Sequence, residues 1–151
     1  MKVHNGQLLN ILTLNRTNLS ELTDKYMFIC LVLDELTFRK YYEKEDEVSI
    51  GFLRKRISKK MSLSLYHKPI ALLEFWLLEV QVMGLITLSK HKEDGKEIIM
   101  TKLTRQGEEA YQKQTYHQIY ANLIAAKLSR WLAILAIFVS LIALIVSLVN
   151  R

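Results

Sequence analysis

The feature that most constrains this chain is residues 131–149, which carry no charged side chain. As an α-helix this run is about 28 Å long, close to the thickness of the hydrocarbon core of a bilayer. Apart from Arg151, every acidic and basic residue of the chain precedes Trp131. A helix of this length that is apolar on every side is typical of a membrane span. We therefore predict one transmembrane helix over residues 131–149, with Trp131 at the membrane interface.

The charges that flank this run predict its orientation. Lys127 and Arg130 closely precede the predicted span, and only Arg151 follows it. Because basic residues accumulate on the cytoplasmic side of a span, we expect residues 1–130 in the cytoplasm. This arrangement is that of a single-pass, tail-anchored membrane protein. The start of the chain does not predict a secretory signal, because polar residues interrupt its apolar stretch.

The small residues of the predicted span form one stripe. Their spacings alternate strictly between three and four, which favours left-handed packing of helices. Small side chains also let helix backbones approach each other closely in lipid. We expect the stripe to mediate self-association or the binding of a partner helix, although Ala and Ser are common in such spans and can align by chance. The stripe consists of Ser129, Ala133, Ala136, Ser140, Ala143 and Ser147.

The charged part of the chain begins with three predicted helices, over residues 20–42, 48–61 and 69–83. Ser20 is a suitable N-cap for the first, and Pro69 fits the first turn of the third. Gly84 can end the third helix in a left-handed conformation.

A hairpin is predicted next, because Asp94-Gly95 supplies the positive φ angles of a tight turn between residues 85–92 and 96–103. Thr104 is a suitable N-cap for a last helix that runs almost unbroken into the span. One side of that helix either packs against the first helix or forms a dimer seam, or does both. That side carries Tyr116, Tyr120, Leu123 and Lys127.

The order helix, helix, helix, two-stranded wing, long helix is that of a winged helix-turn-helix domain. Three matches make the chain resemble the MarR and PadR families of bacterial regulators. They are Gly84-Leu85-Ile86 after the third helix, Asp94-Gly95-Lys96 at the wing tip, and Leu103-Thr104-Arg105-Gln106-Gly107 at the start of the last helix. The resemblance covers about residues 20–120. It implies a DNA-binding dimer whose third helix reads the major groove.

The expected fold is thus mainly α with a small two-stranded β-wing, a winged helix-turn-helix plus one transmembrane helix. We divide it into an N-terminal extension (1–19), a winged-helix domain (20–120), a juxtamembrane helix (121–130) and the span (131–149).

The third predicted helix departs from a DNA-reading helix. Between residues 70 and 83 the chain has no Arg, Lys, Ser, Thr or Asn, the side chains that reach base edges along with Gln. Glu74 and Glu79 would also repel phosphates. Ile70, Leu73, Leu77 and Val80 are expected to pack inward. On the other side, a second apolar stripe predicts a surface for a protein partner: Ala71, Phe75, Leu78 and Val82.

The net charge of +6 suits a polyanionic partner, either nucleic acid or an anionic membrane surface. Basic residues gather in the second helix and the wing. We expect them to contact phosphates or lipid headgroups, unless they form a merely solvated face. They are Arg54, Lys55, Arg56, Lys59, Lys60, Lys90, Lys92 and Lys96.

No catalytic motif, metal site or cofactor site is predicted. The four histidines are scattered, and the single Cys30 is expected to be a buried, inert thiol. The sequence therefore predicts a membrane-anchored, homo-oligomeric, non-enzymatic interaction module or adaptor. The alternative is a membrane-tethered DNA-binding transcriptional regulator.

Overall fold

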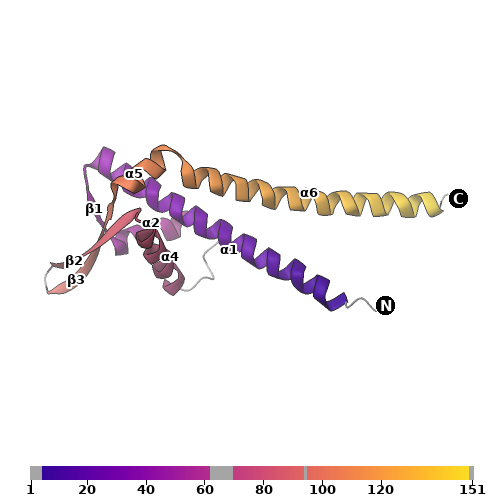
Figure 1. The fold of residues 1–151 in the computed structure, drawn as a ribbon, viewed down its shortest axis with the longest axis horizontal. Coiled ribbons are helices and arrows are strands. Elements are labelled where there is room, and N and C mark those ends of the chain that lie inside the picture. The colour runs from indigo at the N-terminus through magenta and orange to yellow at the C-terminus, as the bar shows by residue number, and fades with distance from the viewer. Residues whose placement is uncertain (1–4, 62–69, 94, 150–151) are drawn as a thin grey trace.

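The computed structural model describes residues 5–61, 70–93 and 95–149 of the chain. It is mainly helical, with a small antiparallel sheet in a head from which two long helices, α1 and α6, project on the same side (Figure 1). The elements are α1 (Asn5–Phe38), a π-helical turn η1 (Arg39–Glu43), β1 (Glu47–Ser49), α2 (Ile50–Lys60), α4 (Ile70–Val82), β2 (Ile86–Glu93), β3 (Lys96–Leu103), α5 (Arg105–Gln112) and α6 (Thr115–Val149).

The sheet has three antiparallel strands in the order β1-β3-β2. The β2–β3 hairpin pairs Ile86 with Leu103, and Gly95 in its turn has the predicted positive φ of 75°. Asp94, predicted beside it, lies outside the described residues. The prediction of only two strands is wrong, because the three-residue β1 pairs with β3. A three-residue strand is defined by its pairing with a neighbouring strand, so the local sequence does not predict it.

The core of the head is built around α1. Phe28 of α1 packs against Trp76 of α4, with ring centroids 5.5 Å apart. Buried residues from α1, α2, α4 and the sheet form one continuous cluster, whereas α6 contributes no fully buried residue. The largest side chains of this cluster with less than 2% exposure are Phe28, Ile29, Leu33, Leu53, Ile57, Met61, Leu85 and Ile86.

The first helix begins earlier than predicted. Ser20 is not an N-cap, because α1 already starts at Asn5, and most of the predicted N-terminal extension is therefore helical. The chain between Gln7 and Ile50 holds no proline or glycine that would end a helix. Thr23, one turn into the predicted helix, donates its hydroxyl to the carbonyl of Leu19, as inside a continuous helix.

The last helix is interrupted, which the sequence did not predict. Thr104 caps α5 as expected, since its Oγ1 accepts a hydrogen bond from the Gly107 amide at 3.0 Å. The chain then turns at Gln114, which has a φ of 54°, before α6 begins. This turn lays α6 against α1, where the rings of Tyr26 and Tyr116 stack at 6.2 Å.

A substitution at Gly107 tests how closely α5 packs on the hairpin. A Cβ at this position would lie 2.2 Å from the backbone oxygen of Leu85 and 2.8 Å from Leu103 Cδ1. We expect Gly107→Ala to lower the free energy of unfolding by about 1–3 kcal/mol, because a backbone oxygen cannot easily move away. The matched control is Gly51→Ala in α2, where nothing lies within 4 Å and alanine favours the helix by up to about 1 kcal/mol. Chemical unfolding of the full chain in detergent measures both, and equal effects would contradict the packing.

Candidate functional site

α4 has one apolar face toward the core and another toward the outside. The inner residues are buried: Leu73, Trp76, Leu77 and Val80. On the other side Phe75, Leu78 and Val82 are 56%, 53% and 88% exposed, so the second apolar stripe is confirmed at these three positions. The side chains of Ile70 and Ala71 lie outside the described residues. We call Phe75, Leu78 and Val82 the α4 outer face.

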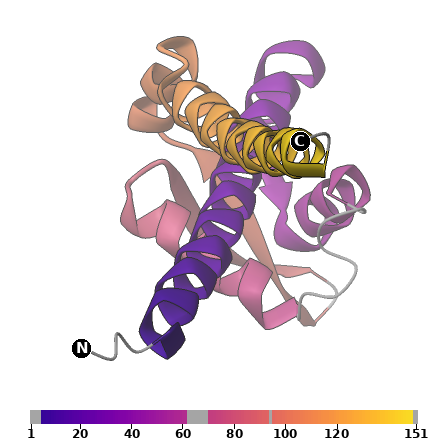
Figure 2. The ribbon, with the colours of Figure 1, turned by 90° about the vertical axis from the view of Figure 1, so that its right-hand side faces the viewer.

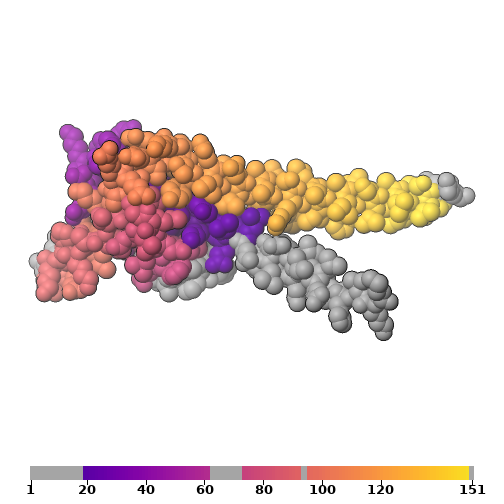
Figure 3. Space-filling model, viewed as in Figure 1, coloured from indigo at the N-terminus to yellow at the C-terminus, as the bar shows by residue number. Residues whose placement is uncertain are grey.

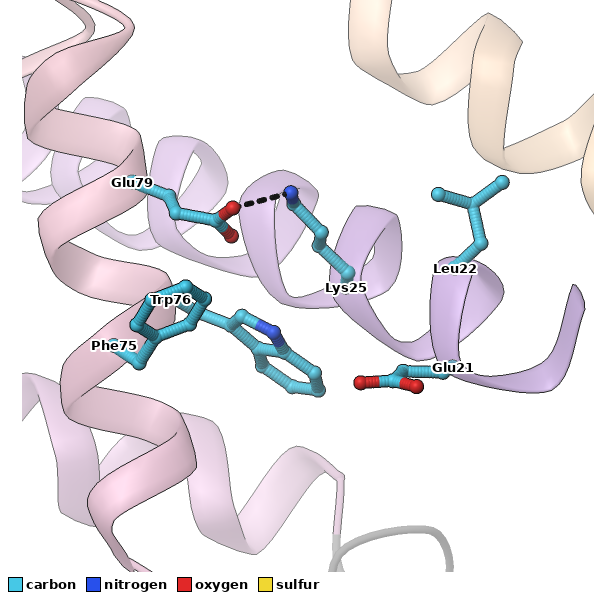
Figure 4. A pocket seen from close by; sticks show the side chains of 6 residues that line it. All are labelled: Glu21, Leu22, Lys25, Phe75, Trp76 and Glu79. Atoms are coloured by element: carbon cyan, nitrogen blue, oxygen red, sulfur yellow. Dashed lines mark hydrogen bonds and ion pairs between the residues drawn. The ribbon is translucent and has the colours of Figure 1, made fainter. Parts of the chain in front are cut away.

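A shallow cavity of about 340 Å³ lies beside this face, between α1 and α4 (Figure 4). Its lining residues are Glu21, Leu22, Lys25, Phe75, Trp76 and Glu79. Lys25 Nζ lies 2.8 Å from Glu79 Oε1 across the cavity, and Glu79 Oε2 is buried without a hydrogen-bond partner among the described residues. The cavity therefore combines aromatic walls with a charged pair. The sequence did not reveal the part played by α1, because the two helices are brought together only by the fold.

Both acidic residues of α4 are engaged in ion pairs. Glu79 pairs with Lys25, and Glu74 lies 3.5 Å from the Arg54 guanidinium of α2. Their charges are thus partly neutralised, which weakens the phosphate repulsion expected from the sequence. Apolar surface, rather than negative charge, distinguishes the exposed side of α4.

Part of the basic helix α2 has a structural role. Glu35 of α1 is buried and faces three cations, with Arg39, Arg56 and Lys60 nitrogens at 3.4, 3.3 and 3.2 Å from its carboxylate oxygens. Burial opposes ionisation of this carboxyl, but hydrogen bonds and the charges of Lys60 and Arg56 outweigh it and lower its pKa. Two of the predicted phosphate or lipid contacts, Arg56 and Lys60, therefore tie α2 to α1.

The other predicted basic contacts divide into paired and unpaired residues. Lys90 on β2 lies 3.7 Å from Glu97, and Arg54 is the partner of Glu74. Among the described residues, the exposed cations without an ion pair on α2 and the hairpin are Lys55, Lys59, Lys92 and Lys96. The tip of the hairpin lies at the end of the molecule opposite to the carboxyl end of α6 (Figure 1).

α6 has two different halves. In the first, Tyr116, Tyr120, Leu123 and Lys127 are half-buried, and burial raises the pKa of Tyr116. From residue 128 to 149 every side chain is exposed, and this half stands clear of the head (Figure 3). Among the described residues α6 is the single helix long and apolar enough to cross a membrane. The packing of the first half against α1 is thus observed, as one of the two predicted alternatives.

The small-residue stripe lies on the exposed half of α6. Ser140 Oγ donates to the Ala136 carbonyl at 2.8 Å, which satisfies this hydroxyl within the helix. A hollow along the helix is lined by Ala136, Ile137, Ser140, Leu141 and Leu144. Ser129, Ala133, Ala143 and Ser147 are exposed as well.

The described residues contain no group of three or more His, Cys, Asp or Glu side chains that could hold a metal ion. Cys30 is buried as predicted, and burial raises the pKa of its thiol to about 12. His117 Nε2 lies 2.9 Å from Asp34 Oδ1, and His91 pairs with Glu47, whereas His4 and His67 lie outside the described residues. The chain matches no protein-family model, no curated protein and no solved structure.

The Glu35 cluster predicts a pH-dependent stability. Because the pKa of Glu35 in the fold is below its ordinary value of 4.5, its ionised form stabilises the fold above that pH. This stabilisation is lost as the pH falls through the lowered pKa. We expect Glu35→Gln to cost about 1.5–3 kcal/mol at neutral pH and to flatten the loss of stability in acid.

The matched control is Glu109→Gln, since Glu109 is 49% exposed and pairs with Arg105 and Lys113 on the surface. Such exposed pairs contribute less than about 1 kcal/mol. Unfolding of the full chain in detergent at a series of pH values measures both variants. An acid limb that is unchanged in Glu35→Gln would contradict the assignment.

Proposed function

We propose that the protein is a non-enzymatic interaction module, anchored to a membrane by residues 131–149, whose head binds a protein partner through the α4 outer face. The observation that carries this proposal is the exposure of Phe75, Leu78 and Val82 on one helix. Contiguous apolar surface on a charged head is a feature of protein-interaction sites.

The spacing and surroundings of the α4 outer face suit a protein partner. Residues 75, 78 and 82 follow the i, i+3, i+7 pattern by which a helix fits an apolar groove. The neighbouring Lys25–Glu79 and Arg54–Glu74 pairs supply a polar rim, the usual border of a protein interface. α4 offers no Arg, Lys, Ser, Thr or Asn with which to read DNA bases.

The proposal includes a winged-helix fold and a cytoplasmic head. The order of α1, α2, α4, the hairpin and α5 supports the first, together with the positive φ of Gly84 and the Thr104 cap. The basic residues that precede the span support the second. Self-association through the small-residue stripe belongs to the same proposal, because the hollow beside Ala136 and Ser140 is open to a second helix.

The α4 outer face is tested by Phe75→Asp together with Leu78→Asp in the full chain. Both side chains are more than half exposed, so we expect stability to change little while the partner is lost. The protein is isolated from its native membranes after cross-linking, and the proteins and nucleic acids that accompany it are quantified. Loss of one central anchor typically weakens binding by about 2 kcal/mol, roughly thirtyfold.

The control for this test is Ile99→Asp on β3, an apolar residue that is 40% exposed outside α4. It should keep the bound partner. The proposal is rejected if the double variant retains the same proteins as the wild type, or if Ile99→Asp loses them equally.

The second candidate function is binding of nucleic acid by a membrane-tethered regulator. The specific observation in its favour is a set of exposed cations on α2 and the hairpin that have no ion pair with another described residue: Lys55, Lys59, Lys92 and Lys96. The hairpin tip also points away from the carboxyl end of α6 (Figure 1), so solution rather than lipid surrounds it in the proposed orientation. These cations can hold phosphates without reading a sequence.

The nucleic-acid candidate predicts that changing these four lysines to Glu strongly weakens duplex binding and makes it less sensitive to salt. Each phosphate contact that is lost lowers the slope of log K against log salt by about 0.9. Arg56 and Lys60 are left intact, because their removal would disturb the Glu35 cluster. The control is Arg105→Glu, a cation that is 93% exposed on α5. Salt titration of labelled duplex against the full chain in detergent measures the slope, and an unchanged slope in the fourfold variant would exclude this candidate.

A further inference from the structure

The cavity between α1 and α4 adjoins the α4 outer face and shares Phe75 with it. Seen along the long axis of the molecule, α4 passes behind α1, whereas α6 lies in front of it (Figure 2). The anchor helix therefore packs on a different side of α1, and all the lining residues belong to α1 or α4. The cavity is thus part of the same surface of the head as the proposed interface.

The lining of this cavity carries more negative than positive charge. Glu21 and Glu79 contribute two carboxylates, against one ammonium group from Lys25. Lys25 Nζ pairs with Oε1 of Glu79 at 2.8 Å, whereas Oε2 is buried and accepts no hydrogen bond from the described residues. Glu21 is exposed and forms no ion pair or hydrogen bond with another described residue. One carboxylate and one buried carboxylate oxygen of the cavity thus have no donor among the described residues.

The aromatic residues of the cavity suit a cation. Phe75 is 56% exposed, and Trp76 is buried beside it. Figure 4 shows the carboxylates of Glu21 and Glu79 on different sides of the Trp76 indole. Aromatic rings attract cations to their faces. A guanidinium group is planar, is more weakly hydrated than an ammonium group and can donate to two carboxylates at once. The cavity therefore favours an arginine side chain.

We propose that this cavity binds one arginine side chain of the protein partner that docks on the α4 outer face. The inference rests on the proposed function and adds the chemistry of the partner, an apolar segment beside a guanidinium group. The guanidinium donates to Glu21 and to the free oxygen of Glu79, and packs against the Phe75 ring. The Glu79 side chain is 30% exposed, so a rotation of its carboxylate brings that oxygen to the cavity. The bound cation neutralises the excess negative charge, whereas an acidic side chain would add to it.

The test uses Trp76 as a reporter in the full chain in detergent. The chain has two tryptophans, and Trp131→Phe leaves Trp76 as the only one. The probe is N-acetylarginine N-methylamide, and the control probe is its citrulline analogue, which has a similar shape without the charge. At constant ionic strength, we expect the arginine probe to change the Trp76 emission saturably in the millimolar range, as suits one ion pair and one ring contact. The citrulline probe should leave the emission unchanged.

Two variants assign this binding to the cavity. Glu21→Gln removes a charge from an exposed side chain, and Phe75→Leu removes the ring while keeping the surface apolar. Each should weaken binding of the arginine probe about threefold or more. The matched control is Glu109→Gln on α5, which should bind the probe as the parent chain does. The site is overturned if the arginine probe does not change the emission, if the citrulline probe acts equally, or if Glu21→Gln binds like the parent chain.

The role of the cavity in partner binding is tested with the same charge variant. Glu21→Gln leaves the α4 outer face unchanged, so it separates the two parts of the surface. In isolation from cross-linked native membranes, we expect Glu21→Gln to recover about threefold less of the partner and Glu109→Gln to recover as much as the wild type. If Glu21→Gln recovers the partner fully while Phe75→Asp with Leu78→Asp loses it, the arginine site is overturned and the proposed function stands. If the double variant also keeps the partner, both are overturned.

Discussion

The structure depends on one constraint: exposing the apolar surface of α6 to water is unfavourable. From residue 128 to 149 no side chain is buried, and residues 131–149 bear no charge that would hydrate them well. Each Å² of apolar surface left in water costs about 25 cal/mol. The core of the head is already closed without α6, which contributes no fully buried residue to it. The apolar side chains of residues 131–149 must therefore be shielded from water by something outside the fold. Lipid around the proposed span provides this shielding.

α1 holds the head together, because it contributes both central residues of the hydrophobic core and a buried carboxylate. Phe28, Ile29 and Leu33 pack into the core, while Glu35 gathers Arg39 and cations of α2. Removing Glu35 from water is unfavourable by itself, and the surrounding cations offset that cost. Because this network does not involve α6, the head and the anchor are stabilised by separate interactions. Changes in the span are then expected to leave the fold of the head intact.

The sequence was informative wherever a single residue imposes a local conformation. Gly84 and Gly95 adopt the positive φ angles that their positions require, and Thr104 caps α5 through its own hydroxyl. It was uninformative where structure comes from contacts distant in sequence. The strand β1 exists by pairing with β3, and the turn at Gln114 occurs at a residue type that ranks among the good helix formers. The α4 outer face could be read from helical spacing, whereas its neighbouring cavity needs Lys25 of α1 and could not.

The distance between the head and the proposed membrane determines whether its basic residues can interact with anionic lipid or only with a soluble polyanion. Along α6, about 22 Å of helix separates Trp131 from Tyr116, where the head begins. The Debye length is about 8 Å at physiological ionic strength, so the field of a lipid surface falls by more than about tenfold over this distance. A typical tilt of about 20° shortens the separation by little. Lys55, Lys59 and the hairpin lysines are therefore screened from anionic lipid, and a polyanion that binds them must approach through water.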